Sequence, residues 1–321
     1  MVENKKQWKA WLYLAPAIIL LLVFTVWPIV NTLRMAFLNG YSANLEKGGM
    51  TFQFGIANFQ KVLVYGDFLD YLFNTMILCV ATVPISTILA LLIAVALNSI
   101  KPLQRTLQTI FFLPYVTNSI AIGMVFAAMF NIIGLRPAGD MADTWGIINN
   151  VIMFFGGEPI NWMNAGSSYW MNMTVMVIYI VWNALPFKIL VLLGGLQSIN
   201  KQYYDAAKID GTPRRRVFTK ITVPLLSPMI AYVVITGFIG GFKEYSSIVG
   251  IFGEDMGPVH DPGRLNTMVG FIYDSLESRA HGTASAAALI LFVITLIVTM
   301  INTQVSKKRM HCYILTHMQP P

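Results

Sequence analysis

The stretch YYDAAKIDGTPRRRVFTKITVPLLSP, from Tyr203 to Pro228, lies between two long apolar segments of the chain. It contains five Lys and Arg residues and two Asp residues, and it becomes apolar again at its end. Elsewhere charge is scarce, because only 12% of the 321 residues are charged and 56% are hydrophobic. About a quarter of the residues of soluble proteins are charged, so most of this chain's surface is expected to face something other than water.

Six apolar stretches are long enough to cross a hydrocarbon layer as helices, which takes roughly 20 residues each. Backbone groups in lipid must be satisfied within their own segment, so the sequence predicts an all-α polytopic membrane protein. We expect Pro28, Pro84 and Pro186 to kink their helices. The first stretch is expected to stay as a helix rather than be a cleaved signal peptide, because Ala15-Pro16-Ala17 precedes most of the apolar run. The stretches lie near Trp11–Leu33, Asn74–Leu97, Thr109–Phe130, Met171–Leu193, Val223–Phe242 and Ala284–Gln304.

The distribution of Lys and Arg between the loops predicts the orientation. Fourteen of the 22 lie in the N-terminus, the second loop, the fourth loop and the tail, and seven lie on the other side. The positive-inside rule therefore puts both termini in the cytoplasm, and this bias accounts for the net charge of +7 better than a nucleic-acid-binding face does. The expected division is a cytoplasmic N-terminus (1–10), a six-helix membrane domain (11–304) with a cytoplasmic coupling loop (198–222), and a cytoplasmic tail (305–321).

The cytoplasmic loop contains helix-capping and turn residues at the positions expected for two short helices joined by a turn, called the elbow below. Asn200 is expected to cap a short helix that Gly211 ends in a left-handed turn. Thr212 then caps a second helix with Pro213 at its first position, and Pro224 marks re-entry into the membrane. The alternative is that the loop is only a positively charged anchor.

The elbow also carries a family resemblance. Asp205-Ala206-Ala207, three residues, Gly211, nine residues and then Ile221-Thr222-Val223-Pro224 resembles the EAA loop of permease subunits in binding-protein-dependent ABC importers. The family pattern reads Glu-Ala-Ala, three residues, Gly, nine residues, Ile-x-Leu-Pro. This chain has Asp in place of Glu and Val in place of Leu, with the spacing intact.

The resemblance implies the type I ABC importer permease architecture, in which this loop docks in a cleft of a separate ATPase subunit. The two alanines would form a small face for close docking, and Asp205 would pair with a cation of the ATPase. Arg214 to Arg216 would either pair with acids there or meet anionic lipid. The expected coupling residues are Asp205, Ala206, Ala207, Asp210, Gly211, Arg214 and Pro224.

Other segments resemble carbohydrate-type permeases, and the likeness covers nearly the whole chain. It resembles the maltose-type first permease subunit without that subunit's large external domain. Members of this group carry di- and oligosaccharides, and some carry glycerol 3-phosphate or related polyols. The segments that carry the likeness are Arg105–Asn131, His281–Ile301 and Ser306–His311, whereas Cys312–Pro321 fits no pattern.

The fourth apolar stretch holds residues that suit a sugar. Pro186 interrupts helix bonding and frees backbone carbonyls near Trp182 and Asn183. An aromatic face beside an amide fits a sugar ring, which has apolar C–H faces and a rim of hydroxyls. The alternative is that Trp182 and Phe187 only pack and that Asn183 bonds across helices. Lys188 has three interpretations: pairing with an acid of a partner subunit, snorkelling, or contact with an anionic solute.

The fifth apolar stretch contains the Gly-x-x-x-Gly pair Gly237 and Gly241, which favours a close helix contact, expected with a partner permease. By resemblance to the maltose-type pocket, residues of this stretch and of the fourth line the solute path. Glycines there imply a roomier or shallower site, or leave solute contact to the partner, and Lys243 with Glu244 is alternatively an exposed ion pair. The expected path residues are Trp182, Asn183, Ala184, Phe187, Gly237, Gly240, Gly241 and Glu244.

Motifs for catalysis and nucleotide binding are missing from the sequence, among them Gly-x-x-x-x-Gly-Lys-Ser/Thr, His-Glu-x-x-His and Gly-x-Ser-x-Gly. The chain is therefore expected to be no enzyme, with no catalytic residues, no metal site and no cofactor of its own. ATP and Mg are expected on the partner ATPase subunits. The other expected partners are a second, similar permease, favoured over a second copy, an extracytoplasmic solute-binding protein, a sugar and the bilayer, with no nucleic acid.

The sequence thus predicts a permease subunit of a sugar importer, for a di- or oligosaccharide, in a prokaryotic plasma membrane. One alternative is a solute such as glycerol 3-phosphate or another polyol. A second is an ATP-independent secondary transporter, which would need Asp or Glu well inside a span, and a membrane enzyme or receptor comes last. The external loops Asn39–Val62 and Gly253–Met268 are expected either to dock a binding protein or to be plain solvated loops.

Overall fold

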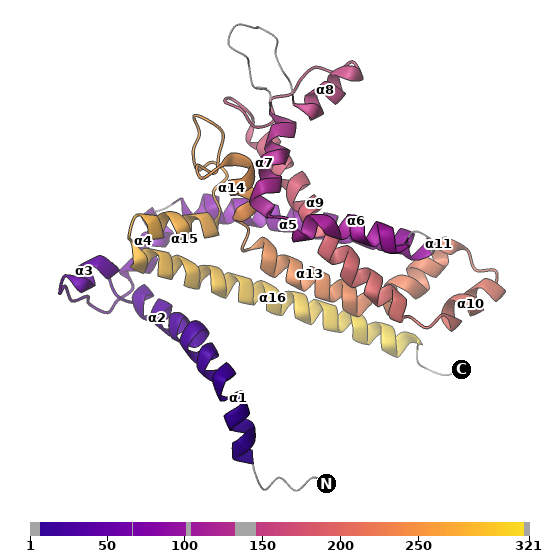
Figure 1. Cartoon of the computed structure of the whole chain (residues 1–321), viewed down its shortest axis with the longest axis horizontal. Coiled ribbons are helices and arrows are strands. Elements are labelled where there is room, and N and C mark those ends of the chain that lie inside the picture. The colour runs from indigo at the N-terminus through magenta and orange to yellow at the C-terminus, as the bar shows by residue number, and fades with distance from the viewer. Residues whose placement is uncertain (1–6, 66, 101–103, 132–145, 318–321) are drawn as a thin grey trace. The chain divides into compact units, whose positions relative to one another are not determined.

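The computed structural model describes residues 7–65, 67–100, 104–131 and 146–317. Every regular element in these ranges is a helix, and their one β pairing is an isolated bridge between Leu38 and Phe54 (Figure 1). Two short elements, η1 and η2, are π-helical turns. The bounds are α1 Gln7–Leu21, η1 Leu22–Val26, α2 Trp27–Ala36, α3 Ala43–Lys47, α4 Ala57–Tyr65, α5 Phe68–Ser99, α6 Gln104–Val116, α7 Ser119–Phe130, α8 Ile147–Phe154, α9 Tyr169–Ser198, α10 Gln202–Ile209, α11 Arg214–Val217, η2 Phe218–Thr222, α12 Val223–Leu225, α13 Ser227–Gly241, α14 Ser246–Phe252, α15 Met268–Glu277 and α16 His281–His317.

The predicted membrane spans are present. In the described ranges, four helical stretches are long and apolar enough to cross a membrane, and there are six spans if each of two bent helix pairs counts as one. Each overlaps one of the six predicted stretches, although Arg214–Leu225 lies mostly in the predicted coupling loop 198–222. The all-α prediction is confirmed, and the six predicted spans are present when each bent pair counts as one. The four are Trp8–Ala36, Phe68–Ser99, Tyr169–Ser198 and His281–Ser306, and the bent pairs are Thr106–Val116 with Ser119–Phe130 and Arg214–Leu225 with Ser227–Gly241.

The third predicted span, Thr109–Phe130, is broken rather than continuous, because α6 and α7 meet at a bend of 97°. Two residues explain the break. Pro114 has no N–H to continue the α6 ladder. The side chain of Asn118 starts a new helix by accepting from the backbone N–H of Ile120 at 2.9 Å and of Ala121 at 3.4 Å. The bend leaves backbone polar groups at membrane depth, which is tolerated where they face protein or a cavity.

The chain forms two compact units. The first contains residues 1–69 and 271–292, and the second contains residues 70–270 and 293–321. In the first unit, the most apolar part of the span Trp8–Ala36 contains no buried residue, and Ala36 at its end is buried. The organising residue there is Asn58, whose buried side chain donates to Ala36 O at 3.0 Å and to Leu38 O at 2.7 Å and accepts from Gly40 N at 3.1 Å. One amide thus fixes the turn that follows α2.

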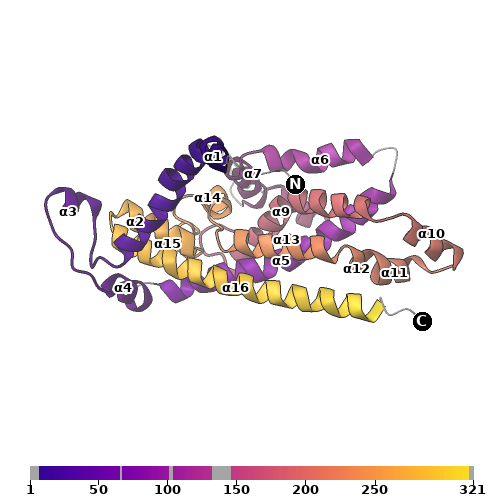
Figure 2. The same ribbon diagram turned by 90° about the horizontal axis from the view of Figure 1, so that it is seen from below.

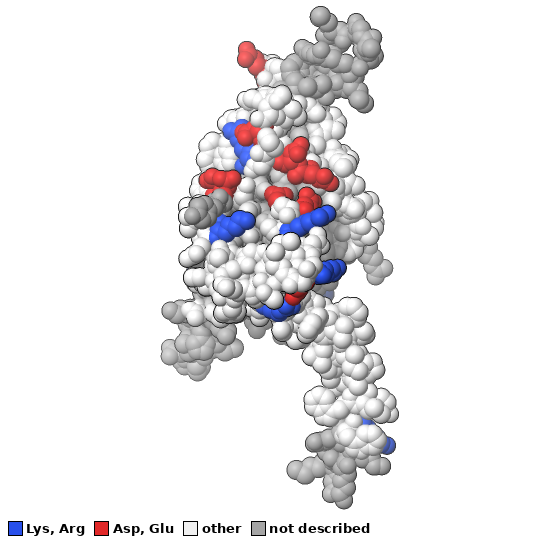
Figure 3. All heavy atoms as spheres, turned by 90° about the vertical axis from the view of Figure 1, so that its left-hand side faces the viewer, with Lys and Arg blue, Asp and Glu red and all other residues white. Residues whose placement is uncertain are grey.

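Beyond that turn, a charged loop of the first unit faces solvent. The guanidinium of Arg34 donates to Glu46 Oε1 at 2.5 Å, and the hydroxyl of Tyr41 donates to Glu46 Oε2 at 2.5 Å. These two hydrogen bonds, the one from Tyr41 first, hold the pKa of Glu46 below its usual range. Figure 3 faces this end of the first unit, where acidic and basic side chains lie side by side, while the surface along α1 is nearly free of charge.

The second unit is organised around α9, which packs against α6, α7, α13 and α14 (Figures 1 and 2). One core cluster surrounds Met176 and Tyr179, and the hydroxyl of Tyr179 donates to Ser119 O at 2.5 Å, beside the break between α6 and α7. The helices α7 and α14 touch through glycines, because a Cβ on Gly123 would lie 2.7 Å from the Cα of Gly250. A second cluster joins α5, α9 and α13, with the buried residues Ala90, Ala94, Leu97, Ile189, Leu192, Leu193, Leu196, Leu226 and Val233.

Candidate functional site

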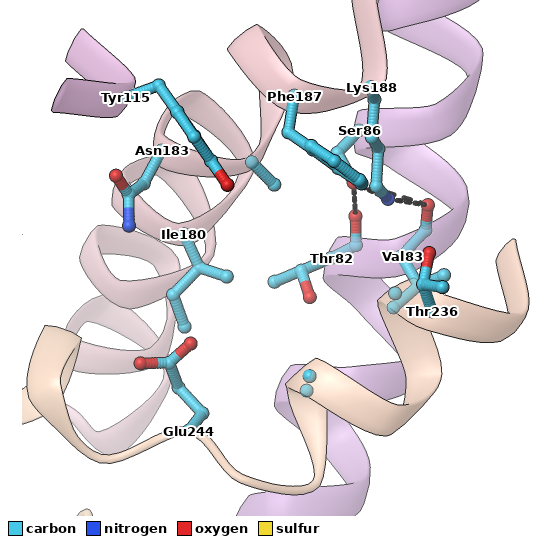
Figure 4. Close-up of a pocket in the computed structure, with 14 residues that line it drawn as sticks. Thr82, Val83, Ser86, Tyr115, Ile180, Asn183, Phe187, Lys188, Thr236 and Glu244 are labelled. Atoms are coloured by element: carbon cyan, nitrogen blue, oxygen red, sulfur yellow. Dashed lines mark hydrogen bonds between the residues drawn. The ribbon is translucent and has the colours of Figure 1, made fainter. Parts of the chain in front are cut away.

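A pocket of about 300 Å³ opens in the second unit between α5, α6, α9 and α13 (Figure 4). This volume is at the small end of the range of roughly 300–1,000 Å³ found for small-molecule sites. The four walls come from distant parts of the chain, with α9 contributing the longest run. The lining residues are Thr82, Val83, Ser86, Tyr115, Ile180, Asn183, Ala184, Phe187, Lys188, Thr236, Gly237, Gly240, Gly241 and Glu244.

The α9 wall combines an aromatic face with an amide. The ring of Phe187 stacks on that of Tyr115 from α6, with centroids 6.0 Å apart and planes 20° from parallel. The amide nitrogen of Asn183 donates to the hydroxyl of Ser119 at 3.3 Å, a long hydrogen bond that leaves the amide oxygen available. Because Tyr115 and Ser119 flank the break after α6, the bend helps to build the pocket.

The α13 wall is made of glycines that admit α5. A Cβ on Gly241 would lie 2.7 Å from Cys79 Sγ, and one on Gly237 would lie 3.1 Å from Val83 Cγ1, whereas one on Gly240 would meet nothing within 4 Å. The close contact made by the Gly-x-x-x-Gly pair is therefore with α5 of the same chain, and the expectation of a partner permease on this face was wrong. The open position at Gly240 keeps the pocket wide.

Two charged side chains line the pocket. Lys188 is buried, with 4% of its surface exposed, and its Nζ donates to Ser86 Oγ at 2.6 Å, Thr87 Oγ1 at 3.0 Å and Val83 O at 3.2 Å. It therefore does not snorkel. The half-buried Glu244 accepts from the backbone N–H of Ser247 at 3.1 Å, at the start of α14, and its carboxylate is directed into the pocket in Figure 4.

The structure brings seven of the eight predicted path residues together in this pocket. The eighth, Trp182, packs on Phe126 instead, with ring centroids 5.1 Å apart, as the packing alternative had it. Sequence reasoning missed the α5 and α6 walls. Their signal was weak: Thr82, Ser86 and Thr87 are hydroxyl residues close to Pro84 in an otherwise apolar stretch.

The elbow predicted within residues 198–222 consists of α10, a turn at Gly211 and α11. Gly211 has a φ of 63°, in the left-handed region, as expected. The turn is a Schellman motif, because Thr212 N donates to Ala207 O at 2.9 Å and Gly211 N donates to Lys208 O at 3.2 Å. Asn200 Oδ1 accepts from Gln202 N at 3.0 Å at the start of α10.

Two details of the elbow differ from the prediction. Pro213 is itself the N-cap residue of α11, in an extended conformation and without a side-chain cap, so Thr212 does not cap this helix. Of the two alanines expected to form a docking face, Ala207 is 5% exposed and packs inside the chain, because the Schellman turn folds back over it.

The remaining coupling residues are at the surface. Asp205, Ala206, Asp210, Gly211 and Arg214 are exposed, and Pro224 lies half-buried in α12. Figures 1 and 2 both place the elbow, the first turn of α6 and the C-terminal end of α16 at the same end of the second unit. The predicted N-terminal segment 1–10 and the last residues of the tail extend outside the described residues.

No group of three or more His, Cys, Asp or Glu residues is placed to hold a metal ion in the part of the chain that the structure describes. The groups that line the pocket are two aromatic rings, an amide, hydroxyls, one carboxylate and one ammonium group, and the ammonium group is hydrogen-bonded within the chain.

Known proteins resemble this chain along nearly its whole length. The lactose transport system permease protein of Rhizobium radiobacter is 31% identical over 91% of this chain and 91% of its own length. The arabinooligosaccharides transport system permease protein of Bacillus subtilis is 28% identical over 92% of this chain and 88% of its own.

The fold has a counterpart in a crystal structure of a bacterial alginate ABC transporter in complex with alginate pentasaccharide-bound periplasmic protein. The TM-score is 0.72 at 22% identity, over 95% of this chain and 96% of the other. The family described as "Binding-protein-dependent transport system inner membrane component" matches residues 54–311. This chain belongs to that family of transport-system membrane components.

Proposed function

We propose that this chain is the permease subunit of an ATP-driven, binding-protein-dependent sugar importer and that its pocket is part of the solute path. The observation that carries the proposal is the convergence of seven sequence-predicted path residues on one pocket. An aromatic pair, an amide and a carboxylate together suit a sugar ring, which offers C–H faces for stacking and hydroxyls for hydrogen bonds.

The cargo of the relatives supports a sugar. Their names specify lactose and arabinooligosaccharides, and a trehalose/maltose permease of Thermococcus litoralis is 26% identical over 93% of this chain. The pocket volume of about 300 Å³ suits one or two sugar rings better than a long chain. A disaccharide would therefore fit in this pocket, whereas a longer oligosaccharide would pass with only part of its length in it.

The energy enters through the elbow. The exposed Asp205, Ala206 and Arg214 would contact a separate ATPase subunit, which binds ATP and Mg, since the sequence has no phosphate-binding loop of its own. The Schellman turn at Gly211 fixes the angle between α10 and α11, so closure of the ATPase would move α13 as a lever.

The orientation follows from the charge bias. Fourteen cations lie in the segments proposed to be cytoplasmic, and seven lie on the other side. Both termini and the elbow would then be cytoplasmic, in a prokaryotic plasma membrane. A second permease would complete the path, and an extracytoplasmic solute-binding protein would deliver the sugar to the opposite side.

The first test is a tagged purification from the native host in mild detergent, with mass spectrometry of the proteins recovered. We expect a second permease, an ATPase and a solute-binding protein. The matched variant is a chain with Asp205→Ala, which removes the proposed contact with the ATPase and leaves the turn at Gly211 intact, and it should lose the ATPase and keep the second permease. A chain that purifies alone from membranes in which the ATPase is present would contradict the proposal.

The second test is uptake into proteoliposomes that contain the purified complex, with radiolabelled lactose, maltose and glycerol 3-phosphate as probes. We expect uptake of a sugar that requires both ATP and the binding protein. Uptake of glycerol 3-phosphate alone would instead support the polyol alternative. Sugar uptake without ATP would support a secondary transporter.

A further inference from the structure

Lys188 occupies the boundary between the pocket and the protein interior. It lies in the middle of the span Tyr169–Ser198, where a cation is costly and normally has a specific partner. Its side chain extends from α9, and its Nζ reaches α5, where it meets three oxygen atoms. Figure 4 shows two of these partners, Ser86 and Val83, beside Lys188. The partners are two hydroxyls and a carbonyl, so they can solvate the ammonium group but cannot neutralise it.

The hydrogen bonds at Nζ are complete. An ammonium group has three N–H donors, and these are directed to Ser86 Oγ, Thr87 Oγ1 and Val83 O. Each hydroxyl can accept from Lys188 because its own proton is engaged elsewhere: Ser86 donates to Thr82 O at 2.5 Å, and Thr87 donates to Val83 O at 2.7 Å. The orientation of both hydroxyls is therefore set, and no donor of Lys188 remains for a solute.

The hydrogen bonds from Lys188 reach the turn of α5 that contains Pro84, and this link between α9 and α5 is called the tie below. A proline has no backbone N–H, so the helix ladder is weakened at this turn. The residues that Lys188 contacts follow or precede Pro84 by at most three positions, and two of them, Val83 and Ser86, also line the pocket. Lys188 therefore holds the α5 wall at the turn where Pro84 interrupts the helix bonding.

A glycine of α13 leaves room for the Lys188 side chain between α9 and α5. A Cβ on Gly237 of α13 would lie 3.3 Å from Lys188 Nζ and 3.1 Å from Val83 Cγ1. Contacts this short would force the ammonium group or α5 to shift. The glycine at this position and the lysine opposite thus form one arrangement, in which α5, α9 and α13 meet at a single point.

We propose that Lys188 is a positioning residue: its ammonium group ties α9 to the proline-containing turn of α5 and so sets the shape of the pocket wall, without binding the solute itself. The role in solute uptake rests on the proposed function, whereas the tie itself is a property of the folded chain. Glu244 is then the charged group of the pocket that is left to meet a solute, and it accepts hydrogen bonds from hydroxyls and repels anions.

A distance measurement tests the tie without any transport. Spin labels are attached at Ile88→Cys on α5 and Leu190→Cys on α9, two exposed positions, in a full chain with Cys79→Ser and Cys312→Ser. Pulsed electron paramagnetic resonance should give one narrow distance distribution for this chain. Lys188→Met should broaden and lengthen it, and adding Ser86→Ala should change it no further.

The matched control is Thr174→Val, which removes a hydroxyl of α9 that bonds only within its own helix, to Trp170 O at 2.7 Å. We expect a distribution like that of the parent. An unchanged distribution in Lys188→Met would overturn the tie, whether or not the complex transports a sugar. A complex that moves no sugar with ATP, together with a broadened distribution, would remove the proposed function and leave the tie standing.

Uptake kinetics then test the positioning role in the assembled complex, with whichever of radiolabelled lactose or maltose the parent complex takes up. Lys188→Met should raise KM about fivefold with kcat nearly unchanged, a size typical of one interhelical hydrogen-bonded contact in a membrane. Ser86→Ala should raise KM in the same direction, and the double variant should match Lys188→Met alone, because the two residues act as one tie.

Two results would contradict the proposal. If the effects of the two substitutions multiplied, and if galacturonate inhibited uptake by the parent complex but not by the Lys188→Met complex, Lys188 would be a ligand for anionic solutes. A reduced amount of assembled complex with an unchanged KM would make Lys188 a residue needed only for folding.

Discussion

The elbow is held by hydrogen bonds between near neighbours on the chain, such as Thr212 and Ala207, whereas the pocket is lined by residues from Thr82 on α5 to Glu244 beyond α13. The elbow also lies at the surface, with most of its residues exposed, while Lys188 in the pocket wall is 4% exposed. A local motif can therefore specify the elbow, but only the packing of four helices can specify the pocket. Substitutions in the two regions should fail in different ways.

The largest effect is expected at the turn of the elbow, from Gly211→Pro. Proline fixes φ near −65° and has no N–H, whereas Gly211 has a φ of 63° and donates to Lys208 O. The turn cannot form, so α10 and α11 lose their angle. We expect ATP-dependent uptake to be lost while the ATPase activity of the complex continues, measured in the same proteoliposomes.

The matched control for this change is Gly156→Pro, outside the two loops expected to dock a binding protein. Gly156 also has a positive φ, 82°, and its N–H donates to Met153 O at 2.9 Å, so the same local geometry is destroyed. Uptake and hydrolysis should remain coupled in this variant. Wild-type uptake by Gly211→Pro would show that the elbow does not transmit the movement.

A smaller effect is expected in the pocket from Phe187→Ala, which should weaken sugar binding and leave coupling intact. The change removes the stack on Tyr115, and aromatic pairs are worth roughly 0.5–1.5 kcal/mol, or about twofold to thirteenfold in an equilibrium. We expect KM for the sugar to rise by that factor while hydrolysis stays coupled to uptake. Phe292→Ala, at an exposed phenylalanine of α16, should leave KM unchanged. A loss of coupling in Phe187→Ala would erase the distinction between the two regions.

The same distinction explains what could be predicted from the sequence. The spans and the elbow depend on apolar length and on residues such as Gly211, whose conformational need is local, so both were predictable. The α9 and α13 walls were predictable because the family resemblance places Asn183 and the glycines at positions that line the path, although glycine itself is not the residue expected there. The α5 wall was not, since Ser86 and Thr87 acquire their role only when Lys188 of another helix reaches them.

The break in the third span shows the same limit. Pro114 and Asn118 are consistent with a helix end, but the apolar pattern continues across them, so the sequence alone favoured one helix. Which interpretation holds is decided by Tyr179 and Asn183 of α9, which bond to Ser119 just after the break. Tertiary contacts here override the hydrophobic pattern.

A third prediction concerns the packing that brings the pocket walls together, through two adjacent glycines of α9. A Cβ on Gly195 would lie 2.7 Å from Leu226 Cδ1 and from Met229 Cγ, whereas one on Gly194 would meet nothing within 4 Å. Gly195→Ala should therefore destabilise the chain by roughly 1–3 kcal/mol, the usual cost of overpacking. Gly194→Ala should be neutral or slightly stabilising, because alanine favours a helix by about 1 kcal/mol over glycine.

Thermal unfolding of the two variants in the same detergent measures the difference. A lower midpoint for Gly195→Ala alone would show that the α9 and α13 walls are packed tightly at this level. Equal midpoints would mean that Leu226 and Met229 move aside, and that the pocket walls are looser than their contacts indicate.

The smallest effect is expected from a change of pH at the charged loop of the first unit. Like the elbow, this loop is held by groups that are close together on the chain, but here the groups are ionisable side chains. Hydrogen bonds from Tyr41 and Arg34 lower the pKa of Glu46, so the ionised form stabilises the loop. The stabilisation is complete above the usual pKa of 4.5 and is lost as pH falls through the lower pKa of the folded chain. Amide exchange between residues 41 and 49, corrected for its intrinsic pH dependence, should quicken in that acidic range only.

Glu46→Gln should show the faster exchange at every pH, and Glu158→Gln, in another exposed loop, should behave like the parent chain. If Glu46→Gln exchanged as slowly as the parent at neutral pH, the loop would be held by backbone hydrogen bonds such as that from Gly49 N to Glu46 O. The charged loop and the elbow would then both be held by backbone hydrogen bonds alone.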